Sequence, residues 1–217
     1  MGLLDLFFPA VCVNCRREKR TKLGLCCNCL PQVEFTGLQA CIRCGRICRL
    51  RECAPHDHRY SRVLSLAHYR GPWRRVVQGA KFARDLSLAK ELARELAGLA
   101  LEAGLALPQA VTPVPSASRH WRNYDIVNLI CRDLSRRTGA PVVEALARRP
   151  GRPPQVELDR RQRAEGLEDY IYSKIFLPGA LVWLVDDVYT TGATADACAG
   201  ALLAAGARSV YVLVLGS

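Results

Sequence analysis

After about residue 60, hydrophobic positions along the chain alternate between the two-residue period of strands and the longer period of helices. Five apolar segments have the length of buried strands: 62–69, 110–114, 141–146, 181–185 and 210–215. Three segments have helical spacing and each stops at a glycine: 86–104, 125–139 and 195–206. Asp125 can cap the second of these helices. Strands that alternate with helices predict an α/β fold, here a Rossmann-like open parallel sheet covered by helices.

The first quarter of the chain has a different pattern. Nine of the eleven cysteines fall before residue 54, in short pairs, so we expect a small cysteine-rich domain over residues 1–59 and an α/β domain over 60–217. Within the second domain, residues 148–168 combine arginines and prolines without any useful period. That composition predicts a long basic loop, and basic loops of this length usually have a ligand.

The cysteine pairs have the spacing of zinc knuckles. Two x2-spaced pairs predict one tetrahedral site of four thiolates, made by Cys12, Cys15, Cys26 and Cys29, with Cys27 as a bystander. A second set repeats the pattern with a histidine: Cys41, Cys44, Cys53 and His56. Cys48 and His58 compete for the last two places of that second set. Both sites would be structural because protein ligands fill every position, and the alternative is that these are free cysteines in a reduced core.

A second constellation follows the apolar strand at 181–185. Asp186 and Asp187 come at its carboxyl end, and a turn of small and hydroxyl residues then leads directly into a helix: Thr190, Thr191, Gly192, Ala193 and Thr194. Such a turn can wrap backbone N–H groups around a phosphate at the positive end of the helix dipole. The two acids can accept hydrogen bonds from a ribose diol. The competing interpretation is an acidic strand end followed by a threonine that caps the helix.

The run from Val185 to Thr194 resembles the signature for phosphoribosyl pyrophosphate (PRPP) in type I phosphoribosyltransferases. Together with the zinc knuckles it resembles the ComF (competence protein F) family. The likeness spans nearly the whole chain and includes Thr112-Pro113-Val114-Pro115, Lys81-Phe82, Gln155 and Arg163. It is weaker at 122–126, where the family's Arg-Gly-Phe-Asn-Gln is Arg-Asn-Tyr-Asp-Ile, and at Gly166, where an asparagine is expected.

The resemblance implies a phosphoribosyltransferase-like domain behind a double zinc ribbon, with magnesium accompanying PRPP. In an enzyme, Asp186 and Asp187 would position the ribose, residues 190–194 would hold the 5′-phosphate, and the leaving pyrophosphate would meet Lys81, Arg119 or Arg122. For Lys81 and Arg122 the alternative is a solvated surface charge. No element that recognises an acceptor base is evident in the sequence, so a PRPP sensor without turnover is a second hypothesis.

The net charge of +11 supports a third hypothesis, in which the protein handles nucleic acid. The ComF resemblance implies a role in DNA uptake, with single-stranded DNA and a competence helicase as partners. Stacking surfaces would come from Trp73, Trp121 and a few tyrosines. The first nine residues lack a basic leader and read as a short docking helix, and no apolar run approaches the ~20 residues that span a bilayer. We therefore expect a cytoplasmic protein with reduced thiols and no membrane contact.

Overall fold

The computed structural model describes residues 11–37, 58–82, 85–116, 125–150 and 170–217. Several predicted features lie outside these ranges: the short helix at the start, the second cysteine set, most of the basic loop, Trp121, and the arginines Arg119 and Arg122. These remain predictions. No helix among the described residues is long and apolar enough to cross a membrane.

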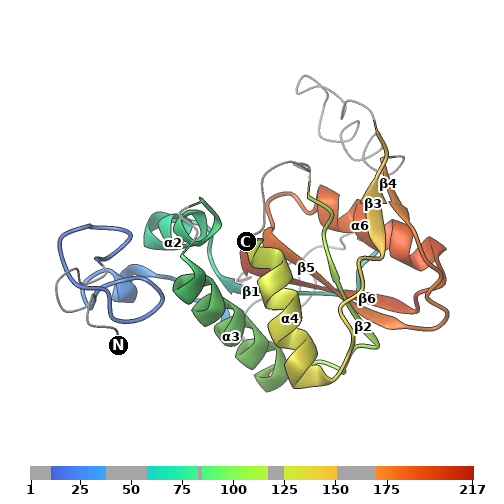
Figure 1. Cartoon of the computed structure of the whole chain (residues 1–217), viewed down its shortest axis with the longest axis horizontal. Coiled ribbons are helices and arrows are strands. Elements are labelled where there is room, and N and C mark those ends of the chain that lie inside the picture. The colour runs from blue at the N-terminus through green and yellow to red at the C-terminus, as the bar shows by residue number, and fades with distance from the viewer. Residues whose placement is uncertain (1–10, 38–57, 83–84, 117–124, 151–169) are drawn as a thin grey trace, which may run out of the picture.

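A four-stranded parallel sheet forms the centre of the molecule (Figure 1). Its order is β1-β6-β5-β2, with the strands β1 (Arg62–Ala67), β2 (Ala110–Pro113), β5 (Leu181–Val188) and β6 (Ser209–Gly216). Beyond β2, Val142 makes a parallel bridge to Val111. The chain therefore leaves β2 in one direction and runs from β5 to β6 in the other. The switch point, where open α/β sheets bind their ligands, falls between the carboxyl ends of β2 and β5.

Helices cover both faces of this sheet. One face carries α2 (Gly71–Phe82), α3 (Leu86–Glu102) and α4 (Ile126–Thr138), and the other carries α6 (Ala193–Ala204) (Figure 1). The two-residue period of β5 explains the division, since Trp183 and Val185 join the core under α2–α4 while Val182 and Leu184 join the core under α6. The predicted α/β architecture with a parallel sheet is confirmed.

Local signals set the helix ends. The carboxylate of Asp85 accepts a hydrogen bond from the Leu88 amide at 3.0 Å at the start of α3, and Asp125 does the same for the Val127 amide at 2.9 Å at the start of α4. Gly139 ends α4 in the left-handed conformation, with φ of 76°. Helix α2 was not predicted, although its buried residues have helical spacing: Pro72, Trp73, Val76, Val77 and Ala80.

The predicted strand over 141–146 is wrong. Only Val142 joins the main sheet, by a single bridge, and the chain then turns away. Strand β3 (Leu146–Arg148) instead pairs antiparallel with β4 (Ile171–Ser173), and this hairpin packs against α6. Arg148, expected at the start of the loop, is consequently held in a strand. The apolar residues Ala145 and Leu146 pack in the core beneath α6 and do not pair with the main sheet.

The cysteine-rich segment packs into the same core as the helices. Leu23 and Leu25 are fully buried in one cluster with Leu88 and Leu92 of α3. The Leu23 amide donates to a carboxylate oxygen of Glu91 at 2.9 Å, and Arg20 forms an ion pair with Asp85. The domain boundary near residue 59 stays a prediction, but the first segment is anchored to α3 by apolar and polar contacts.

Candidate functional site

The first predicted zinc site is assembled in the structure. The four sulfur atoms of Cys12, Cys15, Cys26 and Cys29 all lie within 4.8 Å of one another, and the Cys15 and Cys26 sulfurs are 3.8 Å apart. Sulfurs held by tetrahedral zinc at ~2.3 Å stand about 3.8 Å from one another, so the cluster has the size that zinc requires. Cys27 is exposed and lies outside the cluster, as its role as a bystander predicts.

The chemistry of the four thiols also fits a cation. Burial raises the pKa of Cys26 to about 12, whereas for Cys12 the backbone amides of Cys15, Cys26 and Asn14 outweigh burial and lower the pKa to about 6. Four thiolates so close together repel one another, and a divalent cation removes that cost. The side-chain amide of Asn14 donates to the Cys29 sulfur at 3.3 Å, an outer contact of the kind that orients metal ligands.

The second zinc set lies outside the described residues, apart from His58, its alternative ligand. His58 stacks on Tyr60, with ring centroids 4.8 Å apart, and its Nδ1 lies 3.7 Å from a carboxylate oxygen of Asp196. The structure thus shows one four-cysteine site, and the second zinc remains a prediction.

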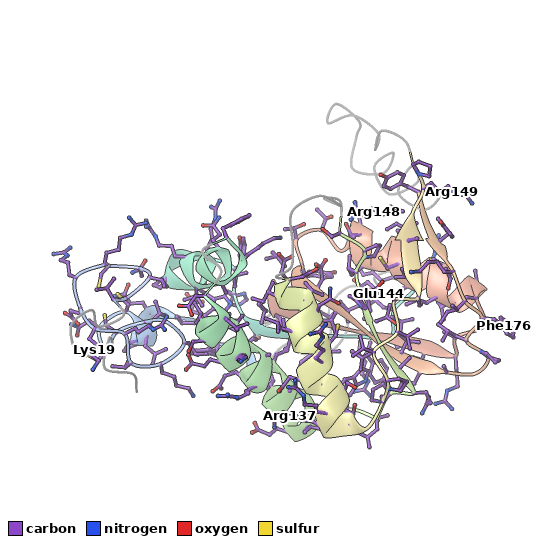
Figure 2. All side chains as sticks on the ribbon, in the orientation of Figure 1. Lys19, Arg137, Glu144, Arg148, Arg149 and Phe176 are labelled. Carbon is purple, nitrogen blue, oxygen red and sulfur yellow. The ribbon has the colours of Figure 1, made fainter. Side chains whose placement is uncertain are left out.

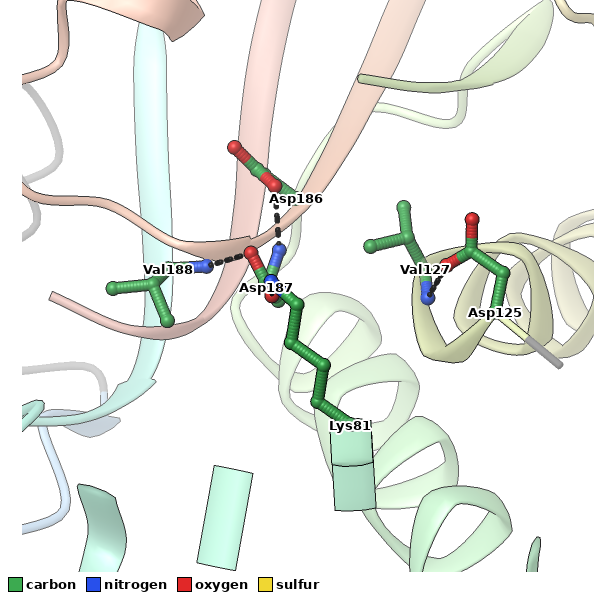
Figure 3. Close-up of polar contacts among 6 residues, drawn as sticks. All are labelled: Lys81, Asp125, Val127, Asp186, Asp187 and Val188. Carbon is green, nitrogen blue, oxygen red and sulfur yellow. Dashed lines mark hydrogen bonds and ion pairs between the residues drawn. The ribbon is translucent and has the colours of Figure 1, made fainter. Parts of the chain in front are cut away.

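In the α/β domain, Asp186 and Asp187 lie at the carboxyl end of β5 and still within the strand. Because side chains alternate across a strand, the two acids leave it in opposite directions (Figure 3). Asp187 continues the face of Trp183 and Val185 and forms an ion pair with Lys81 of α2. Asp186 continues the other face and accepts a hydrogen bond from the Asp187 amide at 2.8 Å.

The two acids differ in their electrostatic surroundings, since Asp187 is paired with Lys81 and Asp186 is buried beside a second carboxylate. Burial, reinforced by the charge of Asp187, raises the pKa of Asp186 to about 7. The ion pair places the Lys81 side chain, which is 32% exposed, beside that of Asp187, which is 12% exposed, so Lys81 is not a freely solvated surface charge. A carboxyl whose pKa lies near neutrality at a sheet edge is typical of a functional position.

The turn after β5, residues 190–194, is the predicted phosphate loop. Gly192 adopts a φ of 83°, which favours glycine, and precedes the first residue of α6. The Ala193 amide donates to the Thr191 hydroxyl oxygen at 3.3 Å, and the Asp196 amide donates to the Gly192 carbonyl at 2.8 Å as the helix begins. Thr190 and Thr191 are exposed residues beside the N-terminus of α6.

A cleft of about 420 Å³ joins these parts at the switch point of the sheet. It lies among the ends of α2, β2, β5 and the starts of α4 and α6, and its polar or charged lining residues are Lys81, Ser116, Asp125, Arg148, Asp186, Asp187 and Thr194. Three of these, Ser116, Asp125 and Arg148, were not predicted as site residues. Asp125 was recognised only as a helix cap, and Arg148 enters because β3 folds back, with its Nε donating to the Pro115 carbonyl at 2.7 Å.

Comparison with known proteins agrees with this architecture. Residues 3–60 match the family described as double zinc ribbon domain. The chain is 31% identical to the DNA utilization protein YhgH of Salmonella typhimurium over 98% of this chain and 92% of that protein. It is 31% identical to the Escherichia coli K12 protein of that name, over 94% and 89%, and 29% identical to competence protein F of Haemophilus influenzae, over 95% and 96%.

A solved structure of a glutamine PRPP amidotransferase from B. subtilis is similar at a TM-score of 0.40 and 22% identity, over 58% of this chain and 25% of that one. The chain thus combines an N-terminal zinc ribbon with an α/β domain built on a parallel sheet, which defines its class. Within this class, the chain belongs to the family of competence protein F and the DNA utilization protein YhgH. The resemblance inferred from the motifs is therefore confirmed.

Proposed function

We propose that the cleft between β2 and β5 binds PRPP together with magnesium. The observation that carries this proposal is the continuous run from Asp186 through Gly192, in which an acidic strand end at the switch point leads directly into the N-terminus of α6. Asp186 and Asp187 would accept hydrogen bonds from the ribose diol, and residues 190–194 would surround the 5′-phosphate.

The charges around the cleft support an anionic ligand at two places. One is the positive N-terminus of α6, which follows the loop directly, and the other is the pair of cationic side chains, Lys81 and Arg148, that line the cleft. A pyrophosphate group would therefore meet Lys81, with Arg119 or Arg122 as further candidates outside the described residues. Carboxylate oxygens are the ligands that magnesium prefers, so Asp186 and Asp187 fit an ion carried by the substrate.

Calorimetric titration of the zinc-loaded protein with PRPP and magnesium tests the proposal. We expect saturable binding, competition by ribose 5-phosphate and no competition by adenine, because the site reads sugar and phosphate. An absence of PRPP binding by folded protein would refute it. A pyrophosphate-release assay across nucleobases then separates the two uses of the site: release identifies a transferase, and binding without release identifies a sensor.

A specific surface favours single-stranded DNA as a second ligand of the protein. On the β3–β4 hairpin, the guanidinium of Arg149 lies 5.5 Å from the ring centre of Tyr172, which is 40% exposed, and Arg148 lies 5.9 Å from the ring of Tyr170. Figure 2 shows Arg148 and Arg149 together at this hairpin. Arg148 faces the cleft, so the exposed pair is Arg149 and Tyr172, and a cation beside an exposed ring suits a phosphate and a stacked base. Trp73 does not contribute, since it is fully buried and donates to the Leu215 carbonyl at 2.7 Å.

Fluorescence anisotropy with an oligothymidine tests this second role. The affinity should fall as salt rises. The slope of log affinity against log salt concentration should be about −0.7 per phosphate contacted, so ~4 contacts give about −3. Replacing Arg149 and Tyr172 together with alanine should weaken binding, whereas Arg137→Ala, which removes one exposed charge from the last turn of α4, should not. Equal losses, or a flat salt profile, would count against a DNA surface at the hairpin.

A further inference from the structure

A chain of aromatic rings connects the segment that follows the cysteine-rich region to the phosphate loop. The His58 ring stacks on Tyr60 at an interplanar angle of 19°, and the Tyr60 hydroxyl lies 2.6 Å from the Tyr189 hydroxyl. Both tyrosines are buried, at 4% and 6% exposure. This hydrogen bond between two buried hydroxyls restrains both rings, because separating them would lose a hydrogen bond inside the core.

Tyr189 in turn lies directly against the loop. A Cβ atom placed on Gly192 would stand 2.5 Å from the Tyr189 hydroxyl oxygen and 2.9 Å from the adjacent ring carbon. The phenol therefore occupies the space beside the Gly192 backbone. Its position determines how closely the loop approaches the core, and thus where the backbone amides of the loop stand.

A second contact joins the same segment to the start of α6. The Arg59 amide donates to a carboxylate oxygen of Asp196 at 2.7 Å, and the Asp196 amide donates to the Gly192 carbonyl at 2.8 Å. Residues 58–60 thus contact the loop through Tyr60 and the first turn of the helix through Arg59. These two points hold the two parts of a phosphate site, the turn and the helix N-terminus.

We propose that residues 58–60 form a brace that positions the phosphate loop, with Tyr60 as the positioning residue for a 5′-phosphate. The inference rests on the proposed function, since it assumes that the loop holds the phosphate of PRPP or ribose 5-phosphate. It adds that affinity for the phosphate is set in part by a hydroxyl that never touches the ligand.

The brace makes a selective prediction. Tyr60→Phe removes one hydroxyl and keeps the packed ring, so it should weaken binding of ribose 5-phosphate and PRPP by the same factor, about twofold to tenfold for the loss of one hydrogen bond. Inorganic pyrophosphate with magnesium has no 5′-phosphate, so its affinity should change less. A merely structural role would lower the melting temperature without this selectivity.

Ser61→Ala is the matched control. It removes the neighbouring hydroxyl, which lies 2.7 Å from the Ser209 hydroxyl at the exposed start of β6, away from the loop. Calorimetry of the zinc-loaded full chain should show unchanged affinities for all three ligands. Hydrogen exchange of ligand-free protein gives an independent measurement: Tyr60→Phe and Tyr189→Phe should each speed exchange in residues 190–196, and Ser61→Ala should not.

The outcomes separate the two proposals. If the wild type binds no PRPP and no ribose 5-phosphate, the proposed function fails and the inference fails with it. If the wild type binds both but Tyr60→Phe leaves their affinities and the exchange of the loop unchanged, only the brace is refuted. An equal loss of affinity for pyrophosphate and for ribose 5-phosphate in Tyr60→Phe would also refute the brace, because the effect would not be specific to the 5′-phosphate.

Discussion

The cysteine cluster and the cleft at the sheet edge both bring ionisable groups together, but the groups are arranged and balanced differently in the two places. In the cluster, four ligand atoms converge within 4.8 Å and come from eighteen consecutive residues, 12–29. The cleft takes its groups from segments as distant as Lys81 and Thr194, and its acids are balanced in part by a lysine. A closed set of ligands serves folding, whereas an open and partly balanced set leaves room for a substrate.

The largest expected effect breaks the closed site. Cys12→Ser or Cys29→Ser should unfold the cysteine-rich segment, because zinc binding there supplies folding free energy, on the order of 10 kcal/mol in small zinc modules. Elemental analysis should show the loss of one zinc, and circular dichroism should show lost structure. The exposed Cys27→Ser is the control. Equal damage from that control would show that the ligand set is wrong.

Elemental analysis of the wild type bears on the second ribbon as well. The sequence predicts two zinc ions per chain, the second held by the set that includes Cys41 and His56. Protein purified without chelator should therefore contain about two zinc ions per chain. A value of one would leave only the described cluster.

The open site should be most sensitive at its glycine. Gly192→Ala places a side chain against Tyr189 at a backbone angle that favours glycine, and strain and displacement of ~3 kcal/mol would weaken ribose 5-phosphate binding about a hundredfold. Gly179→Ala is a matched control, since Gly179 also has a positive φ, of 68°, but a Cβ there would meet nothing within 4 Å. Similar losses of affinity in both variants would assign the effect to backbone strain alone.

Changing the acids should have a smaller effect. Asp186→Asn together with Asp187→Asn removes charge while keeping volume, and charge-assisted hydrogen bonds worth ~1.5–3 kcal/mol each predict at least about a tenfold loss of PRPP affinity. Calorimetry measures the loss, and near-ultraviolet circular dichroism checks that the fold survives. Unchanged affinity in a folded double variant would remove the acids from the site.

The smallest effect is a dependence on pH. The pKa of Asp186 is raised from 3.8 to about 7 in the folded protein. Between pH 3.8 and about 7, the folded protein therefore keeps a proton on Asp186 that the unfolded chain has lost. Stability should therefore fall as pH rises through this window, and Asp186→Asn should melt at a higher temperature than the wild type at pH 8. PRPP affinity should rise at most about tenfold from pH 6 to 8, as Asp186 ionises.

The single variant Asp186→Asn also serves as the control for the titration of the ligand. Phosphate groups titrate near pH ~6, and that contribution persists in the variant. The difference between the two pH profiles isolates Asp186. Identical profiles would contradict its ionisation as the cause.

Sequence patterns predicted the features that depend on neighbours along the chain. The knuckle spacing located the four cysteines, the helix caps at Asp125 and Gly139 were visible as residue types, and the acidic strand end identified the loop. Features that depend on packing were not visible. The ion pair between Lys81 and Asp187 requires α2 to lie on one face of β5, and Arg148 enters the cleft only because the chain leaves the sheet after Val142.

The burial of Leu23 and Leu25 against α3 has a consequence for how the chain can be divided. A fragment that began at residue 60 would expose the apolar surface of Leu88 to water and would lose the Arg20 partner of Asp85 at the helix cap. The ribbon therefore cannot be removed or exchanged as an independent cassette. Substitutions on its inner face and on α3 should be acceptable only in compensating pairs, so the two parts are expected to have diverged together rather than by domain shuffling.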